Sequence, residues 1–125
     1  GAPYTTAWLH DTLHGKALTS LEETIRHLTD VPARLFGLRE RGALHEGWHA
    51  DVVVFDPAQI HSGEVAMIND LPGGEGRLYA SATGIRRVFV NGVPTVVDDQ
   101  ATDALPGTVF RSGRDTETVP IPADG

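Results

Sequence analysis

Residues 50–57 read Ala-Asp-Val-Val-Val-Phe-Asp-Pro and contain three consecutive valines. A run of β-branched and aromatic residues that ends at Asp-Pro predicts a strand. Four apolar side chains in succession leave no polar face, so we expect this strand to be buried on both sides, or nearly so. Just before it, Gly42 and Gly47 bracket a short strand or turn over residues 43–46.

Residues 85–97 predict a β-hairpin. Apolar residues lead up to Asn91-Gly92 and valines resume directly after it. Asn-Gly between two apolar runs is typical of a type I′ turn. Pro94 has no N–H to donate, so we expect the return strand to be unpaired on one side at that residue.

Residues 3–38 carry helix patterns instead. One helix is expected to begin at Pro3 and to end near Gly15. A second is expected after Ser20, because Ser20 and Glu23 form the pattern of a capping box. Its apolar face comprises Leu21, Ile25 and Leu28.

A third, shorter helix is expected from Asp30. Asp30 would cap it, Pro32 would occupy its first turn and Gly37 would end it. Its expected apolar filling is Ala33, Leu35 and Phe36.

The rest of the chain is less regular. Residues 58–83 show no sustained period, residues 71–76 have loop composition, and residues 109–111 suit a last short strand. We therefore expect an α+β fold of three parts. These are a helical segment 1–40, a β-sheet portion 41–111 and a polar, mobile tail 112–125.

Composition excludes several classes of protein. Leu, Ile, Val and Phe supply 32 of 125 residues, which favours a folded core over disorder. The net charge of −7 argues against a nucleic-acid partner and against docking on anionic lipid. The absence of cysteine excludes disulfides and thiolate metal sites.

The sequence has no run of 18 apolar residues and no signal-peptide pattern at Gly1. We expect no membrane partner and a cytoplasmic location. The first residue is not methionine, which fits a processed chain, a tagged chain or a fragment.

Two histidine pairs are candidate metal ligands. His10 and His14 are four residues apart on an expected helix, which places both imidazoles on one face. Positions 11–13 lack the glutamate of a metalloprotease motif, so two surface histidines are the simpler interpretation. His45 and His49 share the spacing but flank Gly47 in an expected turn.

Other chemistry-bearing residues have simpler structural interpretations. Asp51 and Asp56 lie at opposite ends of the expected strand, which favours a hydrogen-bonding role for Asp51 and a turn role for Asp56. Arg77 follows a glycine loop; a solvated charge is the main interpretation and an anion site the alternative. Gly73, Gly74 and Gly76 lack the motif of a phosphate-binding loop, and none of the four serines, Ser20, Ser62, Ser81 and Ser112, lies in a nucleophile motif. Trp8 and Trp48 are expected to be packing residues.

Several motifs, in their order along the chain, resemble those of a known family. Residues 42–56 (GALHEGWHADVVVFD) resemble the C-terminal signature of the amidohydrolase superfamily, which leads from the catalytic barrel into a small β-sandwich. Residues 28–38 and 84–92 resemble that family's Thr-x-x-Pro-Ala helix and Val-Asn-Gly hairpin. Further matches at 70–74, 77–78, 105–107 and 111–115 resemble the N-acyl-D-amino-acid deacylase branch, so that the likeness runs from Tyr4 to Asp115.

The resemblance implies a parent enzyme that hydrolyses C–N amide bonds with zinc held in a (β/α)₈ barrel. Family members carry a His-x-His pair that this sequence lacks, and the only lysine here is Lys16. A Ser-Asp-x-Gly-x-His element with the catalytic aspartate would precede Gly1. We therefore assign no catalytic, cofactor-binding or metal residue to this chain, and expect zinc only in the full-length parent.

Three hypotheses follow. The first is a C-terminal fragment of an N-acyl-D-amino-acid deacylase, whose helices end the barrel and whose strands belong to the sandwich. The second is a non-catalytic α+β binding or assembly module, and the third is a small metal-binding domain built on His10, His14, His45 and His49. The fragment hypothesis implies three partners. They are the remainder of the parent chain, a second copy through unpaired edges, and a small-molecule N-acyl amino acid bound by the parent.

Overall fold

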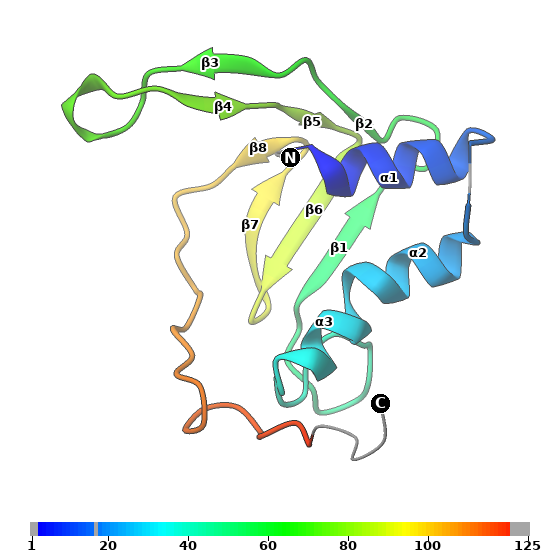
Figure 1. The fold of residues 1–125 in the computed structure, drawn as a ribbon, viewed down its shortest axis with the longest axis vertical. Helices are drawn as coiled ribbons and strands as arrows, with labels where there is room; N and C mark the ends of the chain where they lie inside the picture. Colours follow the sequence, from blue (N-terminus) through cyan, green and yellow to red (C-terminus); the bar gives the residue numbers. More distant parts are fainter. Residues whose placement is uncertain (1–2, 17, 121–125) are drawn as a thin grey trace.

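A computed structural model describes residues 3–16 and 18–120. Three helices lie on one side of a four-stranded antiparallel sheet, and a long two-stranded arm projects from the sheet's upper edge (Figure 1). The polypeptide then returns past the sheet to the helices. Helices followed by antiparallel strands agree with the predicted α+β class.

The first two helices form where the sequence predicts them. Helix α1 spans Tyr4–Leu13 and α2 spans Leu21–Leu28. The Ser20 hydroxyl accepts from the Glu23 amide, and the Glu23 carboxylate accepts from the Ser20 amide, which completes the capping box. Buried Thr24 joins the two helices, because its hydroxyl lies 3.1 Å from that of Thr12.

The predicted start of the third helix is wrong by one residue. Helix α3 spans Asp30–Leu35 with Thr29 at the N-cap position and no side-chain cap. Asp30 lies inside the first turn because its carboxylate pairs with arginines 34 and 26 on neighbouring turns. The predicted filling is also wrong in part, since Leu35 and Phe36 are 66% and 67% exposed and only Ala33 is buried.

The predicted hairpin is confirmed. Strands β6 (Ile85–Val90) and β7 (Val93–Val97) flank Asn91 and Gly92, both at positive φ. The register shifts beside Pro94, which has no N–H for the ladder. On the outer side of β7, Val96 and Val97 pair with the short strand β8 (Gln100–Ala101), which the sequence analysis did not predict.

Strand β1 (Val52–Phe55) forms as predicted, but its predicted burial is wrong. The sheet order is β1-β6-β7-β8, so β1 is an edge strand that pairs with β6 alone. Val53 and Val54 are 55% and 45% exposed although they point to opposite faces. Val52 and Phe55, one on each face, are partly buried, so the described residues cover each face of β1 only in part.

The aperiodic stretch 58–83 contains two short ladders that the sequence analysis did not predict. Strand β2 (His61–Ser62) pairs with β5 (Ala82–Thr83), and β3 (Ala66–Ile68) pairs with β4 (Arg77–Tyr79). The predicted loop at 71–76 is confirmed and includes the 3₁₀ turn η1 (Pro72–Gly74). Gly84 adjoins β5 at positive φ, and a Cβ there would lie 2.6 Å from the Ile60 nitrogen.

Residues 102–118 form an irregular segment, with a turn at residues 112–115, that we call the C-terminal strap. It has no strand, so the strand predicted at 109–111 is wrong. The Glu117 amide donates to the Gly37 carbonyl at 2.8 Å, which holds the end of the strap against the turn after α3. The predicted mobile tail includes residues 121–125, which lie outside the described residues.

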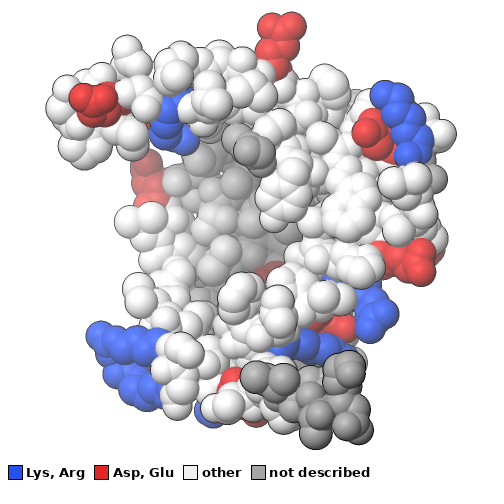
Figure 2. Space-filling view, viewed as in Figure 1, with Lys and Arg blue, Asp and Glu red and all other residues white. Residues whose placement is uncertain are grey.

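The apolar core of the described residues is small. It consists of Leu9, Ala33 and Ile60, while many large apolar side chains are exposed. Figure 2 shows a broad, hollowed face that is mostly uncharged, with the charged residues around its edge. Among residues 3–16 and 18–120, no helix has both the length and the apolar character needed to cross a membrane.

Candidate functional site

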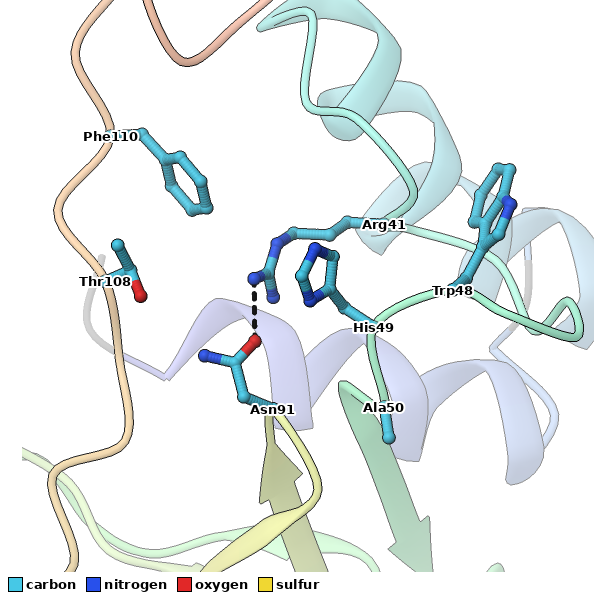
Figure 3. A pocket seen from close by; sticks show the side chains of 7 residues that line it. All are labelled: Arg41, Trp48, His49, Ala50, Asn91, Thr108 and Phe110. Atoms are coloured by element: carbon cyan, nitrogen blue, oxygen red, sulfur yellow. Dashed lines mark hydrogen bonds between the residues drawn. The ribbon is translucent and has the colours of Figure 1, made fainter.

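A hollow of the described surface surrounds Arg41, with a volume of about 560 Å³. It lies between the loop before β1, the β6–β7 turn and the C-terminal strap (Figure 3). Its lining residues are Arg41, Trp48, His49, Ala50, Asn91, Thr108 and Phe110. Phe110 and Thr108 face Arg41 from the strap, and His49 lies beside it.

Arg41 joins three segments that are far apart in the sequence. Its guanidinium pairs with the Asp51 carboxylate, and its Nη2 donates to Asn91 Oδ1 at 2.7 Å. The Phe110 ring centroid lies 5.1 Å from its Cζ, within cation–π range. The side chain of Arg41 is only 10% exposed, so its guanidinium is surrounded mainly by these protein groups and not by water.

Asn91 extends the same network to the strap. Its Nδ2 donates to the Pro106 carbonyl at 2.8 Å, while its backbone N–H donates to Asp51 Oδ1, also at 2.8 Å. Burial acts to raise the pKa of Asp51, but the Asn91 amide and the Arg41 guanidinium outweigh it and hold that pKa below its usual value. The hydrogen-bonding role predicted for Asp51 is therefore what its geometry shows.

Asp56, at the other end of β1, forms the predicted turn. It accepts from the Ala58 amide at 3.0 Å and from Arg86 Nη2 at 2.9 Å. Arg86 first, then the Ala58 amide, lower the pKa of Asp56. Each aspartate has its own arginine partner, so the two carboxylates do not form an acid–base pair.

Arg77 has a partner within the chain. Its Nε and Nη2 each donate to one oxygen of Asp70 at 2.7 Å, and its Cζ lies 5.2 Å from the Tyr79 centroid. The bidentate contact lowers the pKa of Asp70. An anion at this position would have to compete with the Asp70 carboxylate.

The structure separates the two histidine pairs. His10 and His14 stack on α1 with ring centroids 4.3 Å apart, whereas His45 packs on Trp48 at 4.5 Å. Within the described residues no three His, Asp or Glu side chains are arranged to hold a metal ion, which contradicts the four-histidine domain. His61, which the sequence analysis did not single out, joins the first pair with its centroid 5.1 Å from that of His10.

The other candidates have structural roles or none. Ser20 caps α2, and Trp8 packs near His27 at 6.1 Å. Lys16 forms an exposed ion pair with Asp11 at 3.8 Å. Gly73 and Gly74 stand in open space at positive φ, as a loop requires.

Arg41 and Asn91 are the residues that sequence reasoning missed. Arg41 lies ten positions before Asp51 in an aperiodic loop, and the type I′ turn explains Asn91 without any role for its side chain. One indication was present, because Asp51 next to an apolar strand required a partner of opposite charge.

Comparison with known proteins points to one family. Residues 2–96 match the model of the amidohydrolase family. An N-acyl-D-aspartate deacylase of Alcaligenes xylosoxydans xylosoxydans is 39% identical over 97 residues, which is 77% of this chain and 18% of the relative. A D-aminoacylase of the same organism is 35% identical over 93 residues, or 74% of this chain and 17% of the relative.

Solved structures give the same result. A crystal structure of D-aminoacylase superposes with a TM-score of 0.56 at 30% identity, and another, of a D-aminoacylase with a binuclear metal centre, with 0.57 at 32%. Both superpositions cover 77% of this chain and 19% of the solved chain. This chain thus spans less than a fifth of the length of the relatives it matches.

The described residues do not fit a binuclear metal centre of that kind. Such a centre needs several convergent His, Asp or Glu side chains. Residues 3–16 and 18–120 contain no group of three such side chains that could hold a metal ion. The carboxylates of Asp51, Asp56 and Asp70 form ion pairs with arginines.

Proposed function

The chain belongs to the amidohydrolase family, and from that membership we propose that it is the C-terminal segment of a metal-dependent deacylase. The full enzyme hydrolyses the C–N amide bond of N-acyl-D-amino acids. The observation that carries the proposal is the match with three deacylases of one branch, at 35–39% identity over 93–97 residues.

In this proposal the segment contributes structure and not catalysis. Helices α1–α3 end the catalytic barrel, and the strands form part of a C-terminal β-sandwich. The metal, which we propose to be zinc, activates water and polarises the amide carbonyl. Its ligands lie in the remainder of the polypeptide, since the described residues do not fit the centre.

The exposed apolar surface supports a partner in the same polypeptide. Val53 and Val54 of edge strand β1, and Leu35 and Phe36 at the end of α3, are between 45% and 67% exposed. Isolated apolar residues on a surface are ordinary, but residues that continue a sheet edge or a helix end favour a covering layer. We propose that the remainder of the parent chain supplies this layer.

The test is activity of the longest open reading frame that contains this sequence. The purified product is incubated with N-acetyl-D-aspartate, N-acetyl-D-glutamate and N-acetyl-D-leucine, and with their L-enantiomers, and amine release is measured. We expect release from D-substrates only and its loss after chelation. An open reading frame that encodes only these 125 residues, or a long product inactive on every D-substrate, would contradict the proposal.

The alternative is a non-catalytic α+β binding or assembly module. The observation that favours it is the Arg41 network, through which the strap, the hairpin and the loop before β1 are connected without any residue outside the chain. A monomeric, cooperatively folded 125-residue chain encoded on its own would support this alternative.

A further inference from the structure

The β6–β7 turn contains the dipeptide Asn91-Gly92, and an asparagine loses ammonia from its side chain most readily before glycine. Glycine has no Cβ, so its backbone nitrogen can approach the preceding side-chain amide without steric hindrance. The sequence has one other asparagine, Asn69, and the side chain of Asp70 after it hinders the same approach. Asn91 is therefore the asparagine that is chemically more prone to spontaneous deamidation.

The reaction consumes one water molecule and releases one ammonia molecule. The Gly92 nitrogen gives up its proton and bonds to Asn91 Cγ. The Cγ–Nδ2 bond then breaks, and the departing ammonia carries the proton away. Water opens the resulting five-membered imide at either of its carbonyls, which leaves an aspartate or an isoaspartate at position 91.

The fold engages both reacting groups in hydrogen bonds. The Gly92 N–H donates to the Ala50 carbonyl oxygen at 2.9 Å. Asn91 Oδ1 accepts from Arg41 Nη2 at 2.7 Å (Figure 3), and Nδ2 donates to the Pro106 carbonyl oxygen at 2.8 Å. The nucleophile keeps its proton and the amide is fixed at both ends, so the ring closes only after these bonds break.

One contact acts in the opposite direction. A guanidinium that donates to Oδ1 draws electrons from Cγ and so favours attack there. The base in this network is the Asp51 carboxylate, which already accepts from the backbone N–H of Asn91 at 2.8 Å and pairs with Arg41. Because Asp51 is occupied, it does not take the Gly92 proton, and the approach of the nitrogen limits the reaction.

We propose that Asn91 is a deamidation site, that the docked C-terminal strap protects it, and that its conversion releases the strap. The Pro106 carbonyl needs a donor, whereas a carboxylate at position 91 has only acceptors. Two facing acceptors repel each other, so the product loses this contact between the strap and the turn. Isoaspartate also adds a backbone methylene to a two-residue turn that determines the register of the hairpin.

The first test compares the folded chain with the chain in guanidinium chloride above its unfolding midpoint, at one pH and temperature. Trypsin cleaves after Arg87 and Arg111, which isolates Asn91 as the one asparagine of residues 88–111. Mass spectrometry then follows the gain in mass as the amide becomes a carboxylate. Deamidation at Asn91 should be at least about tenfold slower in the folded chain, because only locally opened molecules react. An equal or faster rate in the folded chain would overturn the proposal.

Phe110→Ala determines whether the strap provides the protection. The Phe110 ring lies 5.1 Å from Arg41 Cζ and helps to hold the strap beside the turn. Its loss should raise the deamidation rate of the folded chain at least about threefold. The control is Ser20→Ala, which removes the α2 cap in another part of the chain and should leave the rate within about twofold of the wild type. An unchanged rate in Phe110→Ala, or an equal acceleration in the control, would contradict protection by the strap.

Asn91→Asp tests the release of the strap. Hydrogen exchange over residues 102–118 reports on the strap, whose Glu117 amide donates to the Gly37 carbonyl. These amides should exchange at least about threefold faster in Asn91→Asp than in the wild type. The matched control, Asn69→Asp, adds the same charge at an exposed residue and should exchange like the wild type. Unchanged exchange in Asn91→Asp, or equally fast exchange in both variants, would show that conversion of Asn91 does not release the strap.

Discussion

Arg41 is the least exposed of the ion-paired side chains in the described part of the chain. Its Nε is buried and has no hydrogen-bond partner among the described residues. The Asp51 carboxylate and the Asn91 side-chain oxygen are therefore the groups that stabilise its positive charge. A buried charge that loses its counter-ion costs more than the pair contributed, because the remaining group cannot be hydrated. We therefore expect the stability of the chain to be sensitive to substitution of Asp51 and not only of the apolar residues of the small core.

Asp51→Asn should lower the free energy of unfolding by about 2–4 kcal/mol. The variant keeps the shape of the side chain but leaves Arg41 without a counter-charge. Urea unfolding followed by circular dichroism measures the loss. Asp11→Asn is the control, because Asp11 forms an exposed pair with Lys16 and should change stability by less than about 0.5 kcal/mol. Equal effects of the two substitutions would show that the Arg41 network adds nothing.

Gly84 provides a second test at this scale. Its φ is +85°, and an added Cβ would lie 2.6 Å from the Ile60 nitrogen. We expect Gly84→Ala to cost about 2–4 kcal/mol. Gly74 has a similar φ of +76° but stands in open space, so Gly74→Ala should cost only the backbone strain, about 1 kcal/mol. Similar midpoints for the two variants in urea would rule out a steric effect at Gly84.

At the scale of the helices, strands and turns, the sequence predicts those features that depend on residues close together in the chain. The α2 capping box and the Asn91-Gly92 turn were predictable, because each is a local choice of backbone hydrogen bonds. The exposure of β1 was not, because burial depends on what lies across the sheet. The short β2–β5 ladder was not predictable either, since two residues per strand show no period and their pairing spans some twenty residues. Arg41 belongs to this second group.

The cap of helix α2 allows a direct test of one such local feature. Ser20→Ala removes the acceptor for the Glu23 amide and should cost about 1 kcal/mol. Ser20→Asp keeps an acceptor and should stay within about 0.5 kcal/mol of the wild type. Thermal unfolding measures both, and a loss of stability in the Asp variant as large as in the Ala variant would contradict the capping role.

At the scale of the whole molecule, paired aspartates determine the response to acid. The structure lowers the pKa of five of them, each beside an arginine, namely Asp30, Asp51, Asp56, Asp70 and Asp115. A carboxyl whose pKa is lower in the folded state binds fewer protons there than in the unfolded chain. The stabilisation is therefore present above the unfolded pKa, near 4, and is lost as the pH falls further.

We expect the urea midpoint to be steady between pH 7 and pH 5 and to fall steeply below about pH 4. Measurements at a series of pH values test this. In Asp51→Asn the fall should be shallower, because one of the five groups no longer titrates. A midpoint that rises on acidification would contradict the assignment of these ion pairs as stabilising.

The exposed edge of the sheet predicts how the chain behaves on its own. Among the residues that the structure describes, strand β1 pairs only with β6 and exposes Val53 and Val54, so its outer backbone groups and apolar side chains are open to another strand. The net charge of −7 opposes association, yet at physiological salt charges separated by more than about 8 Å are largely screened. We therefore expect the chain to self-associate as its concentration rises, measured by sedimentation velocity.

Two matched substitutions determine whether the sheet edge is responsible. Val53→Lys and Val109→Lys replace exposed valines with the same charge, but only Val53 lies on an edge strand, while Val109 is 82% exposed on the strap. A lysine on an edge strand discourages pairing with another strand. Val53→Lys should therefore shift the chain towards monomer and Val109→Lys should not. Equal shifts would mean that net charge alone controls association, and a wild type that stays monomeric would remove the sheet edge as the cause.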